Sequence, residues 1–105
     1  MIARQWKARC PREQEKAFIK YLYKTGVKDT SSTHGFKGAQ ILTREVDDKI
    51  EVTLLSYWDK LESIKDFAGE DIDVARLYPE DHIYELEADD FVTHYKVIDS
   101  IWPKN

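Results

Sequence analysis

The stretch at residues 58–81, WDKLESIKDFAGEDIDVARLYPED, decides the fold. It follows an expected strand at residues 50–58 and begins with apolar side chains that recur at helical spacing. These side chains are Leu61, Ile64, Phe67 and Ala68, and they share one face of a helix. Asp59 is of a type that caps helix N-termini, and Gly69 is of a type that ends helices. The stretch therefore predicts a strand that runs directly into a short amphipathic helix.

The residues before this stretch predict a strand and a longer helix. Residues 2–10 alternate between two sets of side chains, as the residues of a strand do. Pro11 ends this strand, and residues 12–25 carry apolar side chains that recur every third or fourth residue. Those side chains are Ala17, Phe18, Tyr21 and Leu22. Gly26 is placed to stop the helix, so we expect the first helix to end there.

A loop and a β-hairpin are expected next. Residues 28–38 are polar and contain several Ser, Thr and Gly residues, a composition typical of a loop. Residues 39–46 and 50–58 have the pattern of two strands, joined by a turn at Asp47-Asp48. The second strand carries a near-continuous apolar run, which predicts a central strand covered on both faces.

The chain after Gly69 predicts another short helical turn and a final strand. The turn is expected at residues 71–77, before Pro79, and the strand at residues 91–98. The resulting order is β-α-β-β-α-β, which is the order of the ferredoxin-like α+β fold with an antiparallel four-stranded sheet. We expect residues 1–105 to form this single domain.

Composition restricts the partners and the location of the protein. The chain has 16 basic and 20 acidic residues, a net charge of −4, and its basic residues are scattered, which argues against a nucleic-acid partner. No apolar run approaches the roughly 20 residues of a membrane helix, and the first residues lack the long apolar region of a signal peptide. We therefore expect a soluble, cytoplasmic protein with no membrane partner. The lone cysteine, Cys10, is expected to be a buried or edge thiol.

Four motifs in this order resemble the antibiotic biosynthesis monooxygenase (ABM) family, in its small single-domain members. They are IARQW at residues 2–6, HGFKG at 34–38, the stretch at 58–81 and HYKV at 94–97. The resemblance implies a dimeric α+β barrel, a homodimer in which two sheets face each other. It also implies that the helices of each chain enclose a pocket against their own sheet.

The characterised relatives include cofactor-independent monooxygenases that oxidise aromatic polyketides. Trp58 looks like the counterpart of the tryptophan that helps form their site. The asparagine four residues before that tryptophan is Leu54 here, and the tyrosine six residues after it is Ile64. Two of the three polar groups of that site are therefore absent from this chain.

The family also includes haem-degrading enzymes, which use a tryptophan, an iron-ligating histidine and an asparagine. The corresponding positions in this chain fall near Phe67, near Leu77 or Tyr78, and near Trp6 or Lys7. No imidazole stands at the ligand position, so haem degradation is the less favoured activity. The three histidines have no metal-binding spacing, and we expect neither a metal nor a cofactor.

Seven residues are candidates for the site. The predicted catalytic residues are His94, Trp58 and Arg4, and the predicted substrate-binding residues are Trp6, Phe67, Tyr78 and His82. His94 could take a proton from a phenol as a general base, or it could be a hydrogen-bonded structural residue. Trp58 could direct its N–H at a ligand or belong to the core. Arg4 either pairs with a buried carboxylate or binds an anionic or enolate ligand.

These residues lead to two hypotheses on function. The first is a cofactor-independent monooxygenase that acts on a small aromatic or polyketide-like phenol or quinol. The second is a non-catalytic or stress-related dimeric barrel that binds a small hydrophobic molecule. Leu54 and Ile64, in place of polar site groups, favour the second hypothesis.

Overall fold

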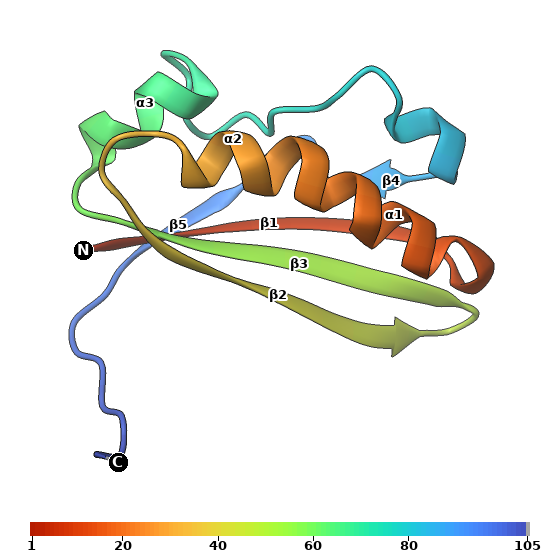
Figure 1. The fold of residues 1–105 in the computed structure, drawn as a ribbon, viewed down its shortest axis with the longest axis horizontal. Helices are drawn as coiled ribbons and strands as arrows, with labels where there is room; N and C mark the ends of the chain where they lie inside the picture. The colour runs from red at the N-terminus through yellow and green to blue at the C-terminus, as the bar shows by residue number, and fades with distance from the viewer. Residues whose placement is uncertain (105) are drawn as a thin grey trace.

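The computed structural model describes residues 1–104, which form one antiparallel sheet with helices on one face (Figure 1). The strands are β1 (Ile2–Pro11), β2 (Phe36–Val46), β3 (Lys49–Trp58), β4 (Glu87–Ala88) and β5 (Thr93–Lys96). The α-helices are α1 (Glu15–Leu22), α2 (Lys28–Ser31) and α3 (Leu61–Ala68). The described residues also form a π-helical segment, Tyr23–Val27, and two 3-10 turns, Arg12–Gln14 and Asp81–Tyr84.

The order and pairing of the strands confirm the predicted fold class. β3 lies between β2 and β1, while β4 and β5 both pair with the other edge of β1. β5 falls within the strand expected at residues 91–98, whereas β4 lies before it and is an unpredicted addition, so the sheet has five strands. β5 is shorter than the expected strand at residues 91–98, because Phe91 pairs with Val74 instead of β1.

The first helix does not end at Gly26, so that prediction is wrong. α1 continues through the π-helical segment into α2, and residues 28–31 are helical rather than part of a loop. Gly26 is buried, and a Cβ on it would lie 3.2 Å from Leu22 Cδ1 and 3.8 Å from Leu54 Cδ2. The helix packs against the sheet at this point, with Leu54 at van der Waals distance from position 26. This packing outweighs the low helix propensity of glycine.

The second helix begins one residue later than expected. Its N-cap position is occupied by Lys60 rather than Asp59, and the Asp59 carboxylate accepts a hydrogen bond of 2.5 Å from the Ser63 hydroxyl. Gly69 follows the helix with a φ of 92°, which confirms the predicted end.

The segment after α3 contains no helix at residues 71–77, which corrects the expectation of a helical turn there. Its backbone groups pair with a distant part of the chain. Ala75 N donates to Asp90 O, and Val92 N donates to Asp73 O. Because these groups bond to residues 90–92, they are not free to form a helical turn.

The hydrophobic core lies between α1 and the sheet. Its buried members are Cys10, Phe18, Leu22, Ile50, Val52 and Leu54. The Cys10 thiol is completely buried, as expected. β3 is central, as predicted, but the described helices cover one face of the sheet only (Figure 1). No helix among the described residues is long and apolar enough to cross a membrane.

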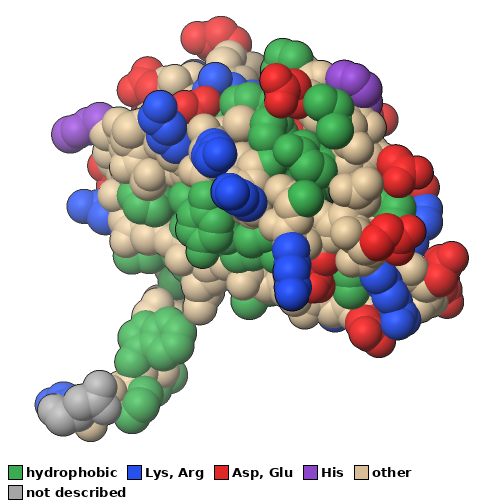
Figure 2. Space-filling view, turned by 45° about the vertical axis from the view of Figure 1, so that its right-hand side comes forward, with side chains coloured by type: hydrophobic (Ala, Val, Ile, Leu, Met, Phe, Trp, Pro, Cys, Tyr) green, Lys and Arg blue, Asp and Glu red, His purple; other side chains and the backbone are tan. Residues whose placement is uncertain are grey.

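The other face of the sheet and the C-terminal tail are rich in exposed apolar side chains. Leu42 and Tyr95 are exposed on that face. The tail leaves the body after β5 and projects from it as an apolar arm (Figure 2). Its side chains Ile98, Ile101 and Trp102 are 84%, 87% and 74% exposed.

Gly35, in the loop before β2, lies against the start of α3, and we expect substitution of Gly35 to lower the stability of the fold. Gly35 has a φ of 95°, its carbonyl accepts the Asp59 N–H, and a Cβ would collide with Ser63 Oγ and lie 2.6 Å from Asp59 Oδ1. Gly35→Ala should lower the free energy of unfolding by about 2–4 kcal/mol, from backbone strain and overpacking together. Urea denaturation measures this loss.

Gly69→Ala is the matched control, because Gly69 also has a positive φ but has open space around a Cβ. Its loss should be about 1–3 kcal/mol, from the backbone alone, and smaller than that of Gly35→Ala. Equal losses in the two variants would show that the contact with Ser63 and Asp59 is not what restricts position 35.

Candidate functional site

A cavity lies between the sheet and the helical layer, closed by the segment that follows α3. Its apolar walls include Trp6, Phe18, Leu22, Leu54 and Phe67. Its polar lining comprises Arg4, Thr25, Thr30, Ser56, Arg76, Tyr78 and Asp81. The space open to the centres of water molecules is about 30 Å³, which is room for about two waters. An apolar cavity with a few convergent polar groups is the usual form of a small-molecule site.

Arg4 is the most buried charged residue of this lining, with 4% of its surface exposed. Its Nη1 donates to Ile72 O at 2.5 Å and lies 3.0 Å from His94 Nε2, and Nη2 lies 3.5 Å from Val74 O. No carboxylate of the described residues is within ion-pair distance of it. Burial lowers the pKa of Arg4 to about 10, an effect that Asp73 partly offsets. Arg4 therefore stays charged at neutral pH, and it lacks the buried carboxylate partner that was one of its two predicted roles.

His94 lies beside Arg4 rather than in the lining of the cavity. The two residues are direct neighbours across β1 and β5, and His94 Nδ1 lies 3.2 Å from Asp73 Oδ1. Burial and the Arg4 charge lower the pKa of His94, while Asp73 raises it. The imidazole is thus engaged on both nitrogens, and neither faces the cavity as a free base.

Trp58 and His82 also lie outside the lining. Trp58 is fully buried, and its indole N–H donates to Ser56 Oγ at 2.9 Å instead of to a ligand position. His82 is exposed, and its Nδ1 lies 2.9 Å from Pro79 O. The structure therefore brings Arg4, Trp6, Phe67 and Tyr78 together around the cavity, and leaves His94, Trp58 and His82 outside it.

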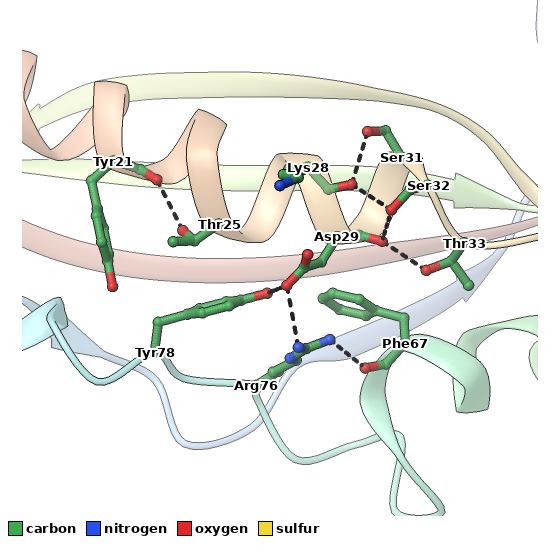
Figure 3. A network of polar contacts seen from close by, with 10 residues as sticks. All are labelled: Tyr21, Thr25, Lys28, Asp29, Ser31, Ser32, Thr33, Phe67, Arg76 and Tyr78. Atoms are coloured by element: carbon green, nitrogen blue, oxygen red, sulfur yellow. Dashed lines mark hydrogen bonds and ion pairs between the residues drawn. The ribbon is translucent and has the colours of Figure 1, made fainter.

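Asp29 on α2 ties the closing segment to the helical layer (Figure 3). Its Oδ2 accepts the Tyr78 hydroxyl at 2.7 Å and lies 3.2 Å from Arg76 Nη2. The Arg76 guanidinium lies over the rings of Phe67 and Tyr78, 5.1 and 5.2 Å from their centroids, and Nη1 donates to Phe67 O at 3.0 Å. Burial and the bond to Asp29 raise the pKa of Tyr78. Tyr78 is accordingly a neutral phenol that helps close the cavity.

Asp81 is the one carboxylate that the described residues contribute to the lining. Its Oδ2 accepts the Tyr78 N–H at 2.9 Å. Burial raises the pKa of Asp81, although the bond from Tyr78 N–H acts in the opposite direction. A carboxylate with a raised pKa, inside a mostly apolar cavity, is suited to proton transfer.

The sequence did not identify Arg76, Asp81 or Asp29 as site residues. Asp81 accepts the N–H of the residue three positions before it, the backward reach that a side chain makes in a capping box, so a local signal exists for it. The sequence predicts a loop at Asp29, because Gly26 predicts a helix end. Its contact with Tyr78 joins residues 49 positions apart, and no local pattern encodes such a contact.

No family profile and no curated protein matches this chain. Solved structures do resemble it over nearly the whole length. A variant of MhuD, crystallised with two manganese protoporphyrin IX molecules per active site, is 15% identical with a TM-score of 0.66, over 98% of this chain and 100% of the other.

Two further structures carry the name of antibiotic biosynthesis monooxygenase. The one from Deinococcus radiodurans is 12% identical with a TM-score of 0.65, and it covers 100% of both chains. The one from Bacillus cereus is 14% identical with a TM-score of 0.66, over 100% of this chain and 98% of the other. At this identity the likeness establishes the fold, which is the one that the sequence resemblance implies.

The cavity does not suit a haem group. Its lining in the described residues has neither histidine nor cysteine, and haem iron is usually held by one of these. A tyrosine ligand must be ionised, whereas burial and Asp29 raise the pKa of Tyr78. The described residues also hold no group of three or more His, Cys, Asp or Glu side chains suited to a metal ion.

The bond between Asp29 and Tyr78 should be measurable as a coupling energy. Tyr78→Phe should lower the free energy of unfolding by about 1–2 kcal/mol, since a bond to a charged acceptor is lost. In an Asp29→Ala background the same substitution should cost much less, and a double-mutant cycle in urea gives the difference.

Tyr23→Phe is the control for this cycle, because Tyr23 is exposed and should change stability by less than about 0.5 kcal/mol. Strictly additive effects of Asp29→Ala and Tyr78→Phe would contradict the tie between α2 and the closing segment.

Proposed function

We propose that this chain is a small ABM-type monooxygenase that binds an aromatic or polyketide-like phenol or quinol as its anion and oxidises it without a cofactor. The observation that carries this proposal is Arg4, a buried guanidinium in the cavity lining without a carboxylate beside it. Burying a charge that has no paired carboxylate is costly, Asp73 offsets this cost only in part, and an anionic ligand beside Arg4 would lower it further. The aromatic walls around Arg4 suit a flat, apolar ring.

Electrostatics in this cavity favours an ionised ligand over a neutral one. A phenolate or enolate oxygen beside a buried guanidinium is stabilised far more than in water, because the surroundings have a low effective dielectric. Binding next to Arg4 would therefore lower the pKa of the ligand. The released proton would go to Asp81, the carboxylate of the lining whose own pKa is raised by burial.

The oxidation itself needs only the substrate and dioxygen. An anthrone-like CH₂ group, activated as the enolate, would give electrons to dioxygen and then combine with it as a peroxide. Loss of water from this peroxide leaves a C=O group, so one oxygen atom enters the product and the other leaves with the two hydrogens. The role of the chain is to ionise the ring, hold it and keep water out.

Access to the cavity requires the closing segment to move. The present space of about 30 Å³ is too small for an aromatic ring. The Asp29 contacts to Tyr78 and Arg76 (Figure 3) hold residues 69–80 over the cavity. Opening these contacts would admit the ligand, and reclosing them would shield it from water.

The second candidate is a protein that binds the same class of ligand without oxidising it. Leu54 supports this alternative, because it lies in the lining at a position where the resembling oxygenases have a polar asparagine. Ile64, the other replaced position, is fully buried and does not line the cavity.

Binding and oxygen uptake together test the proposal. By calorimetry, wild type should bind benzoate at least about tenfold more tightly than its neutral isostere benzamide, since a charge-assisted bond is worth about 1.5–3 kcal/mol. Arg4→Met should remove this preference and Arg4→Lys should keep part of it. With 1,8-dihydroxyanthrone, wild type should consume dioxygen faster than buffer does, and Asp81→Asn should slow this by a factor of about 10²–10⁴.

The outcomes separate the two candidates. A preference for benzoate without oxygen uptake would identify the non-catalytic binding protein. Equal binding of benzoate and benzamide by wild type would reject the anion site altogether. Circular dichroism of each variant shows whether it has folded.

We also propose that the protein is a homodimer joined through the uncovered face of the sheet. That face carries Leu42 and Tyr95, and the tail side chains Ile98, Ile101 and Trp102 line a groove together with Tyr95. Exposed apolar patches rimmed by polar residues mark interaction sites. Light scattering should give twice the mass of one chain, and Tyr95→Lys should shift the population towards single chains. A wild type with the mass of one chain at micromolar concentration would reject the dimer.

A further inference from the structure

A chain of three side chains runs from the cavity to the surface. Arg4 lines the cavity, His94 lies next to it on β5, and the exposed Asp73 follows. Arginine has N–H donors only, so His94 Nε2, 3.0 Å from Arg4 Nη1, must be the acceptor. The single ring proton of a neutral imidazole is then on Nδ1, where it donates to Asp73 Oδ1 at 3.2 Å. The partners thus fix both the charge and the tautomer of His94.

We propose that His94 is a positioning residue, whose neutral Nδ1–H tautomer holds the Arg4 guanidinium in place to bind the anionic oxygen of the ligand. This inference rests on the proposed function, because it takes Arg4 as the anion-binding group. It replaces the role of general base that the sequence suggested for His94. A base needs a free lone pair directed at the substrate, and the His94 lone pair accepts from Arg4.

The contacts of Arg4 determine which part of its guanidinium is left for a ligand. Nη1 has two hydrogens, and Ile72 O and His94 Nε2 occupy them. Nη2 lies 3.5 Å from Val74 O, a long contact for one of its hydrogens. One hydrogen on Nη2 and the hydrogen on Nε have no hydrogen-bond partner among the described residues, and the Nε–Nη2 edge of a guanidinium can bind a carboxylate or similar anion with two parallel bonds. His94 therefore occupies a hydrogen of Nη1, on the side of the guanidinium away from Nε.

Protonation of His94 would destroy this arrangement. The added proton would lie on Nε2, as the second proton of the ring. Nε2 and Arg4 Nη1 would then be two donors, each part of a positively charged group, 3.0 Å apart in a largely buried position. The charged groups that face His94 are Arg4 from β1 and Asp73 from the segment after α3, and burial and Arg4 together lower its pKa. As the pH falls through about 6.5, the unfolded chain takes up this proton before the folded chain does. The folded state should therefore lose stability on acidification, and His94→Gln should remove that part of the loss.

Nitrogen-15 NMR of the full chain gives the tautomer directly, with no ligand present. At pH 7.5 the two-bond correlations of His94 should show a proton on Nδ1 and a bare Nε2. A proton on Nε2, or on both nitrogens, would overturn the inference, because Arg4 would then face another donor.

Two variants test the effect on binding, with benzoate and benzamide as the probes. His94→Leu removes the acceptor and should weaken benzoate binding about tenfold, while benzamide binding stays the same. His94→Gln offers a carbonyl oxygen near the position of Nε2 and should restore benzoate affinity to within about threefold of wild type. His34→Gln, at an exposed histidine far along the chain from Arg4, should bind both probes as wild type does.

The results distinguish a failure of this inference from a failure of the proposed function. If wild type prefers benzoate, and both His94→Leu and His94→Gln bind benzoate as tightly as wild type does, His94 does not position Arg4. Only the inference then falls. If wild type binds benzoate no better than benzamide, the anion site is rejected and the inference with it.

Discussion

A positive charge lies beneath the helices of this fold, and no carboxylate of the described residues is paired with it. Arg4 is held by two carbonyl groups and one imidazole, each of which accepts hydrogen bonds without neutralising the charge. Such an arrangement orients the guanidinium while leaving its charge available. The closing segment and the cavity beneath it depend on this contact, because the carbonyls of Ile72 and Val74 belong to that segment.

The fold brings the parts of the site together through long-range contacts. The register of β1 and β5 places His94 opposite Arg4. The continuous helix from α1 to α2 carries Asp29 to the segment that closes the cavity (Figure 3). Gly26 is buried inside this helix, where packing outweighs its low helix propensity. The continued helix thus positions a carboxylate that binds residues far away in the sequence.

Local patterns in the sequence predicted four of the five strands and part of the buried helical faces, because side-chain alternation and helical spacing determine which face of an element is buried. Two residues of the expected helical faces, Ala17 and Leu61, are exposed. Four residues expected at the site line the cavity, namely Arg4, Trp6, Phe67 and Tyr78. The local patterns failed where tertiary contacts decide the backbone. Residues 71–77 form no helix because their polar groups bond to Arg4 and to residues 90–92. Gly26 does not end a helix because packing favours its continuation. The direction of the Trp58 and His94 nitrogens could not be predicted either, since Ser56 and Arg4 determine it.

The central claim is that Arg4 is the anion-binding group of the cavity. A crystal structure of the protein with benzoate tests it most directly. The account predicts that the carboxylate lies about 3 Å from Nη2 and Nε of Arg4, with the ring between the apolar walls and the His94 contact intact. Benzoate bound elsewhere, or an Arg4 side chain turned to an aspartate or glutamate of the chain, would contradict the account.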